Sequence, residues 1–131
     1  MRGGLCKSEI DAAFASLVQL HAGAILVGSD PFFAGQREQL VAPAARHAVP
    51  AIYEWREFVT AGSLISYGPN LRSVARQLGT YARRILKGEK PADLPVQRPT
   101  RFELVINLKT AKVLGLAVPP TLLAGAVGVI E

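Results

Sequence analysis

Cysteine and acidic residues are both scarce in this sequence of 131 residues. Cys6 is the single cysteine, which excludes an internal disulfide and a cysteine-based zinc cluster. There are 10 acidic residues against 15 lysines and arginines, giving a net charge of +5. Asp30 follows an apolar run, but no acidic pair ends a neighbouring run, as a metal-holding phosphoacceptor site would require. We therefore expect no metal site and no cofactor.

Long apolar runs and catalytic motifs are absent as well. No run reaches the ~18 residues of a membrane-spanning helix, and no apolar core of ~7–15 residues follows Arg2, so we expect no secretory signal. The sequence contains neither G-x-x-x-x-G-K-[ST] nor G-x-G-x-x-G. Ser29 lies in VGSDP, which lacks the G-x-S-x-G elbow of a nucleophilic serine. We therefore expect no catalytic residues, and a protein that is not an enzyme.

Short apolar runs are frequent instead, and half of all residues are hydrophobic. That content is enough to bury a core within one domain or one piece of a larger domain. Helical patterns separate the runs, which predicts an α/β fold with a parallel sheet flanked by helices. The first run does not alternate with polar residues, so we expect a strand buried on both faces. The four predicted strands are 24–28, 49–53, 64–67 and 102–107.

The basic residues concentrate on one predicted helix, over residues 71–87. Arg72, Arg76, Arg83 and Lys87 fall on one face of this helix, and Leu, Val, Ile and Ala residues fall on the other. We interpret the basic face as a solvated helix surface. Because no aromatic interleaving or recognition motif accompanies it, we expect no nucleic-acid partner.

Prolines mark three other segments. Pro43 lies inside a helical pattern over 35–47, which predicts a bend or a helix that begins again at Pro43. Residues 89–100 contain three prolines and form an extended, stiff connector. Pro119 and Pro120 open a last helical stretch. The tail after Leu123 is weakly patterned, and we predict no strand there.

Polar and aromatic residues follow the first three predicted strands, at the point where each strand ends. In a parallel sheet these ends lie on one edge, which is the usual ligand-binding edge of α/β proteins. A carboxylate there suits a ligand amino group, and a tyrosine suits stacking or hydrogen bonding. Aspartate and serine are also common turn residues, so a structural role stays open. The residues are Ser29, Asp30, Tyr53, Glu54, Ser66, Tyr67 and Gly68.

Three segments carry a resemblance to a known family: SEIDAAFASLVQLHAGAILVGSDPFF, ARHAVPAIYEWREFVTAGSLISYGPNL and YARRILKGEKPADLPVQRPTRFELVINLKTAKVLGLAVPPTLL. Over residues 8–123 the chain resembles the C-terminal part of ABC-transporter substrate-binding proteins of the tryptophan/tyrosine type. The resemblance implies a type 1 periplasmic binding protein, in which two Rossmann-like lobes joined by hinge strands clasp a small ligand. It also implies a permease partner, a periplasmic location and no chemical change in the ligand.

The family pattern also implies a domain organisation and a set of ligand contacts. Residues 1–7 are unmatched, and 8–68 correspond to the second lobe. Residues 69–131 supply a crossing helix, the proline-rich connector, the last hinge strand and C-terminal helices. The expected ligand-binding residues face the cleft from the second lobe or lie near the hinge: Asp30, Pro31, Phe32, Tyr53, Glu54, Ser66, Tyr67 and Gly68.

The chain is shorter than the family pattern, so we expect a truncated form that lacks half of the cleft. The leading hypothesis is a solute-binding component, or a fragment of one, for a small molecule such as an aromatic amino acid. The alternative is a non-binding remnant that folds by self-association. Both lead us to expect a homodimer, possibly formed by exchange of the C-terminal strand and helix with residues 91–99 as the hinge.

Overall fold

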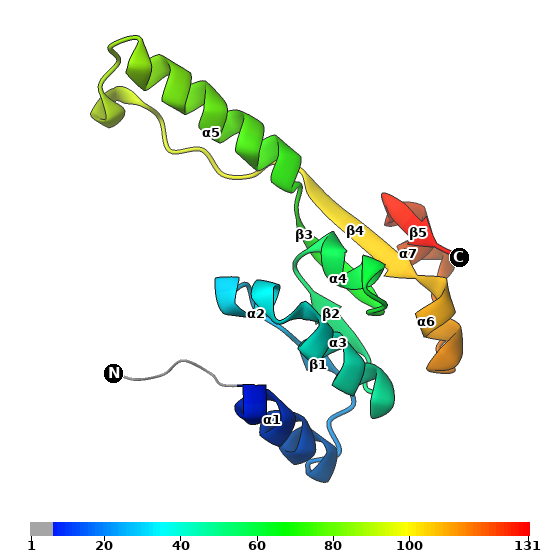
Figure 1. The fold of residues 1–131 in the computed structure, drawn as a ribbon. Helices are drawn as coiled ribbons and strands as arrows, with labels where there is room; N and C mark the ends of the chain where they lie inside the picture. Colours follow the sequence, from blue (N-terminus) through cyan, green and yellow to red (C-terminus); the bar gives the residue numbers. More distant parts are fainter. Residues whose placement is uncertain (1–6) are drawn as a thin grey trace.

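A five-stranded sheet organises residues 7–131, which are the residues that the computed structural model describes (Figure 1). Cys6 and most of the unmatched segment 1–7 lie outside the described residues. The strands are β1 (Ile25–Leu26), β2 (Ala51–Tyr53), β3 (Ile65–Pro69), β4 (Phe102–Asn107) and β5 (Gly128–Ile130). The helices are α1 (Lys7–Gln19), α2 (Pro31–Gly35), α3 (Arg37–Arg46), α4 (Arg56–Thr60), α5 (Leu71–Leu86), α6 (Leu108–Val113) and α7 (Pro120–Gly125), with a 3₁₀ turn η1 (Pro91–Asp93).

The sheet is mostly parallel, and the predicted α/β class is confirmed. The strand order is β1-β2-β3-β4-β5, with parallel pairs β1–β2, β2–β3 and β4–β5. β3 and β4 instead pair antiparallel, with Gly68 opposite Glu103. The chain leaves the sheet along β3, passes through α5 and the connector, and returns along β4, so these two neighbours run in opposite directions.

Two strands differ from the expectations. β1 is an edge strand, and Leu26 within it is 78% exposed, so the expectation of burial on both faces is wrong. Within the described part of the chain, β1 pairs only with β2, which leaves its outer side without a neighbour. β5 lies in the tail for which no strand was predicted, and it adds a parallel neighbour to β4.

Two prolines belong to helices, one at the start of α2 and one inside α3. Pro31 opens α2, and the Asp30 carboxylate caps this helix by accepting a hydrogen bond of 2.7 Å from the Phe32 amide. The fixed φ of proline suits this first helical position. Pro43 lies inside α3, which continues to Arg46, so the helix does not begin again there.

The main core lies between α1, α3, β2 and α4. Its buried side chains are Ile10, Phe14, Leu40, Val41, Ala44, Ala51, Tyr53 and Phe58. A buried polar junction joins the other half of the sheet to this core. Asn107 caps α6 by accepting a hydrogen bond of 3.1 Å from the Thr110 amide, and its side-chain amide donates to the Val59 carbonyl at 3.4 Å. Asn107 thereby ties β4 and α6 to α4.

Residues 71–101, which we call the arm, extend away from the sheet (Figure 1). The helix predicted over 71–87 is present as α5, but none of its residues is buried. The apolar side chains Leu71, Leu78 and Ile85 are 45%, 64% and 41% exposed. The connector returns beside the helix, where the Tyr81 hydroxyl donates to the Pro95 carbonyl. Within residues 7–131, no helix combines the length and apolarity needed to cross a bilayer.

Candidate ligand-binding grooves

Two open grooves lie where β1, β2 and β3 end. The first groove has a volume of about 470 Å³ and is bounded by the residues that follow β2, by β3, by the start of α5 and by Glu103 of β4. The second groove, of about 410 Å³, is bounded by the turn after β1, by Arg37 and by α4. Both grooves are lined by Trp55, Glu57 and Leu71, which form a shared wall between them.

The turn after β1 reaches the second groove with two of its three expected residues. Asp30 and Pro31 line this groove, and the carboxylate of Asp30 is engaged as the cap of α2. Phe32 lines neither groove. Its ring packs edge-on against Phe33, with ring centroids 5.7 Å apart, and lies against the main core.

Tyr53 lies in the core and not at the rim. Its side chain is 2% exposed, and its ring stacks on Phe58 with centroids 4.4 Å apart and an interplanar angle of 9°. The hydroxyl donates to the Leu40 carbonyl at 3.3 Å. Burial raises the pKa of the Tyr53 hydroxyl to about 12, because the charged phenolate would lose its hydration. Tyr53 is therefore a core residue, and its ring is not available to a ligand.

Glu54, Ser66 and Gly68 all line the first groove. Gly68 packs so closely on Glu54 that a Cβ atom at position 68 would overlap the Glu54 carbonyl oxygen and lie 2.7 Å from its Cγ. Tyr67 projects from the other face of the strand, since successive side chains of a strand alternate. Its ring is 55% exposed and stacks on Phe102 at 5.7 Å. The structure thus brings Glu54, Ser66 and Gly68 together and leaves Tyr67 outside the groove.

Sequence reasoning missed several residues of the first groove: Trp55, Arg56, Glu57, Asn70 and Glu103. The first three directly follow Glu54 in the chain, so extending the strand-end pattern into the start of α4 would have included them. Glu103 had no comparable signal. It reaches the groove because β4 runs antiparallel to β3, which places the start of β4 beside the end of β3.

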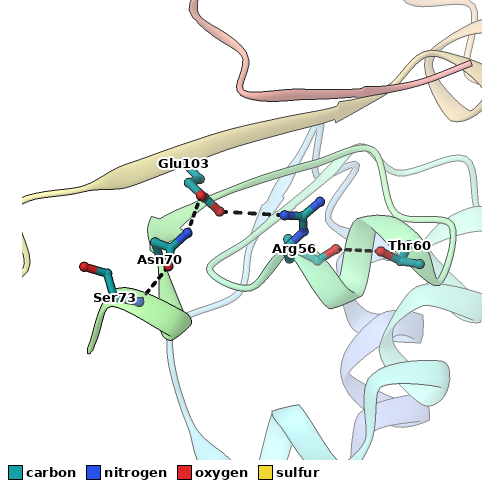
Figure 2. A network of polar contacts seen from close by, with 5 residues as sticks. All are labelled: Arg56, Thr60, Asn70, Ser73 and Glu103. Atoms are coloured by element: carbon teal, nitrogen blue, oxygen red, sulfur yellow. Dashed lines mark hydrogen bonds and ion pairs between the residues drawn. The ribbon is translucent and has the colours of Figure 1, made fainter. Parts of the chain in front are cut away.

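A polar network joins α4, β4 and the start of α5 (Figure 2). The Asn70 side chain donates to Glu103 and accepts a hydrogen bond of 2.8 Å from the Ser73 amide, which caps α5. Glu103 Oε2 lies 4.0 Å from Arg56 Nη1, and the two side chains are 19% and 59% exposed. An exposed ion pair of this length contributes little to stability. Glu103 thus lies between the arm, where Asn70 donates to it, and Arg56 of α4.

The groove offers groups for binding. The Oε2 atoms of Glu54 and Glu57 are buried without a hydrogen-bond partner, so two carboxylates of the first groove have unused acceptor capacity. Within residues 7–131, no three histidine, cysteine or acidic side chains are placed to hold a metal ion. Charged side chains beside the partly buried Trp55 suit a small polar ligand with an apolar part.

Comparison with known proteins identifies the same family that the sequence resembles over residues 8–123. The family model described as ABC transporter substrate binding protein matches residues 7–130. A conserved domain protein from Vibrio cholerae O1 biovar El Tor superposes with a TM-score of 0.87 at 25% identity. An ABC domain from Streptococcus pneumoniae, solved in complex with L-Trp, superposes with a TM-score of 0.82 at 27% identity. No curated protein is significantly similar in sequence.

The solved structures are longer than this chain. A ligand-free, open substrate-binding protein with adhesive properties from Clostridium difficile shares the fold, with a TM-score of 0.65 at 24% identity. In all three comparisons the match covers 96% of this chain and 42% of the solved chain. Since the family model matches 7–130 of the 131 residues, the chain belongs to the ABC transporter substrate-binding protein family.

Proposed function

We propose that this chain forms part of the solute-binding component of an ABC transporter, and that a small molecule binds at the carboxyl ends of β1, β2 and β3. The observation that carries the proposal is the pair of grooves at this edge, which share the wall of Trp55, Glu57 and Leu71. The first groove, at about 470 Å³, falls within the ~300–1,000 Å³ of small-molecule sites. Binding there involves no chemical change in the ligand.

We further propose an aromatic amino acid as the ligand. The Streptococcus pneumoniae relative was solved with L-Trp, which supports this class. Trp55 supplies an aromatic surface to both grooves, and aromatic rings pair favourably in stacked or edge-on arrangements. The expected contacts that line the grooves remain proposed contacts: Asp30, Pro31, Glu54, Ser66 and Gly68. Tyr53 and Phe32 lie in or against the core, and Tyr67 lies outside both grooves.

The complete binding component requires more than the described lobe. This chain spans 42% of the length of the solved chains, so we propose that the first lobe of the family pattern closes over the grooves of this second lobe. Closure driven by the ligand would present the loaded protein to a permease, in the periplasm. In the domain division that we propose between residues 68 and 69, α5 belongs to the first lobe, and the projection of the arm away from the sheet supports this division (Figure 1).

A second role is favoured by one observation, the uncovered apolar face of α5. Leu71, Leu78 and Ile85 are all more than two-fifths exposed. Stable monomers rarely expose a large contiguous apolar surface of this kind. A chain that covers this face by self-association without binding a solute would be a structural remnant.

Ligand binding to the chain separates these two roles. We expect L-Trp, L-Tyr or L-Phe to raise the melting temperature, because selective binding to the native state stabilises it. Trp55→Ala should weaken the titrated affinity by about tenfold, since a lost aromatic contact is worth ~0.5–1.5 kcal/mol beyond its buried area. Leu86→Ala is the matched control, because Leu86 is 88% exposed at the end of α5. Indifference to every amino acid would favour the remnant.

A further inference from the structure

The first groove has three carboxylates and two guanidinium groups, and only one of these carboxylates has an ion-pair partner in the groove. Three carboxylates, of Glu54, Glu57 and Glu103, line it together with the guanidinium groups of Arg56 and Arg72. Glu103 accepts a hydrogen bond from Asn70 and faces Arg56. The other two carboxylates each hold one buried oxygen, Oε2, with no hydrogen-bond partner.

A buried carboxylate oxygen without a donor is costly. Removing a polar group from water without a replacement hydrogen bond is unfavourable, and more so for a charged group. Nearly all buried polar groups of native proteins have a hydrogen-bond partner, so these two oxygens call for a donor from outside the chain. The terminal torsion of a glutamate side chain is broad, so either carboxylate can turn its unpartnered oxygen toward a donor in the groove at small cost. The natural donor for two carboxylates is an ammonium group.

Arg56 lies between these two glutamates in the chain, at the start of α4. Its side chain is 59% exposed, and its contact with Glu103 is 4.0 Å long, at the outer limit of an ion pair. A guanidinium has five N–H donors in a planar fork that matches a carboxylate in two parallel hydrogen bonds. The geometry therefore leaves Arg56 able to bind a ligand carboxylate while Glu103 holds its position.

We propose that Glu54 and Glu57 form an ammonium subsite and Arg56 a carboxylate subsite, so that the first groove binds the zwitterionic head of an α-amino acid. This inference rests on the proposed function and names the part of the ligand that the groove recognises. An α-amino acid carries its ammonium and carboxylate groups on one carbon atom, which matches opposite charges supplied by residues 54, 56 and 57 of one short segment.

Three ligands that share an indole ring test the proposal by isothermal titration. L-Trp has both charges, tryptamine lacks the carboxylate, and indole-3-propionate lacks the ammonium group. We expect L-Trp to bind at least tenfold more tightly than either analogue, because a hydrogen bond to a charged group is worth about one factor of ten or more. Glu57→Gln and Glu54→Gln should weaken L-Trp and tryptamine about tenfold and leave indole-3-propionate unchanged. Arg56→Gln should weaken L-Trp and indole-3-propionate and leave tryptamine unchanged.

Charge-matched controls lie outside the groove. Glu38→Gln and Arg46→Gln change exposed residues of α3, and both should bind all three ligands like the unmodified chain. If the unmodified chain binds L-Trp and the glutamate variants bind it equally well, the ammonium subsite is overturned while the proposed function stands. If the unmodified chain binds none of L-Trp, L-Tyr, L-Phe and tryptamine, the proposed function is overturned, and the proposed ammonium and carboxylate subsites are overturned with it. Circular dichroism of each isosteric variant confirms that it folds.

Discussion

Gly68 is the residue at which β3 approaches the chain after β2 most closely. A Cβ atom there would overlap the Glu54 carbonyl oxygen. We predict that Gly68→Ala lowers the free energy of unfolding by about 1–3 kcal/mol, the usual cost of overpacking a tightly packed site. Urea denaturation followed by circular dichroism measures the change.

Gly79→Ala is the control for this prediction. Gly79 lies within α5, and a Cβ atom at position 79 would meet no atom within 4 Å. Alanine is favoured over glycine inside a helix by about 0.5–1 kcal/mol, so this variant should keep or raise helix content. Equal destabilisation by both substitutions would contradict the close approach at Gly68.

Tyr53 gives the protein a dependence on alkaline pH. Its folded-state pKa is about 12 and its ordinary value is 10.0, so the native state holds the proton more tightly than the unfolded state does. The stabilisation is fully present below pH 10.0 and is lost as the pH rises through about 12. The slope is at most about 1.4 kcal/mol per pH unit.

Tyr53→Phe isolates this effect, because the ring stays stacked on Phe58 while the hydroxyl is removed. We predict that the variant is less stable by about 0.5–1.5 kcal/mol at neutral pH, through the lost hydrogen bond to Leu40. The difference should shrink and reverse between pH 10.0 and about 12, measured by urea midpoints across that range. A constant difference over the whole range would show that Tyr53 ionises equally in both states.

At the residue scale, the sequence identified which residues follow each strand but not which way each side chain points. Ser66 and Gly68 face the groove whereas Tyr67 does not, and strict strand alternation would have separated them. The position of Tyr53 had no such signal. Its burial depends on Leu40 and Phe58, which are brought to it by α3 and α4.

At the element scale, long and well-patterned segments were predicted well. β4 has the predicted bounds, and α5 ends one residue before the predicted end. Gly62 follows the last residues of α4 with a φ of 107°, a left-handed backbone that glycine adopts readily. β5 and α2 were missed, because three residues of a tail and five residues after a proline carry too little periodicity. The direction of β4 relative to β3 depends on the path of the chain through the arm. The apolar pattern of a single strand carries no information about that path.

Asn107 links three elements, and the two asparagines of the chain make a matched pair. Asn107 is 6% exposed and caps α6 while donating to Val59, whereas Asn70 caps the exposed α5. We predict that Asn107→Ala lowers the free energy of unfolding by about 1–3 kcal/mol, because it leaves buried backbone groups without partners.

Asn70→Ala should instead leave the melting temperature nearly unchanged and accelerate amide exchange within α5. None of the residues of α5 is buried, so this helix can fray without opening the core. Hydrogen exchange resolved by residue distinguishes the two variants. A large drop in melting temperature for Asn70→Ala would mean that the arm is part of the cooperative core.

At the scale of the whole molecule, the arm predicts self-association. Leu71, Leu78 and Ile85 recur at seven-residue intervals and form one exposed apolar stripe along α5. We predict a dimer in size-exclusion chromatography with light scattering at micromolar concentration, since covering such a stripe is favourable. Leu78→Glu should shift the mass toward the monomer.

Thr80→Glu is the control for that substitution, because Thr80 is an exposed polar residue of the same helix. It adds the same charge away from the stripe and should leave the dimer intact. A monomer at high concentration for the unmodified chain would contradict self-association, whether through the stripe or by exchange of the C-terminal strand and helix.

The antiparallel pair of β3 and β4 also couples the twist of the sheet to the position of the arm. Both strands that connect the arm to the sheet pass through the short ladder from Pro69–Phe102 to Ile65–Ile106. A helix of 16 residues such as α5 is about 24 Å long. A change of about 15° in the twist of the ladder would carry the far end of α5 through about 6 Å, given that length. A small change in twist beside Glu103 would therefore move the far end of α5 by several ångströms, a displacement that a pair of fluorophores can report.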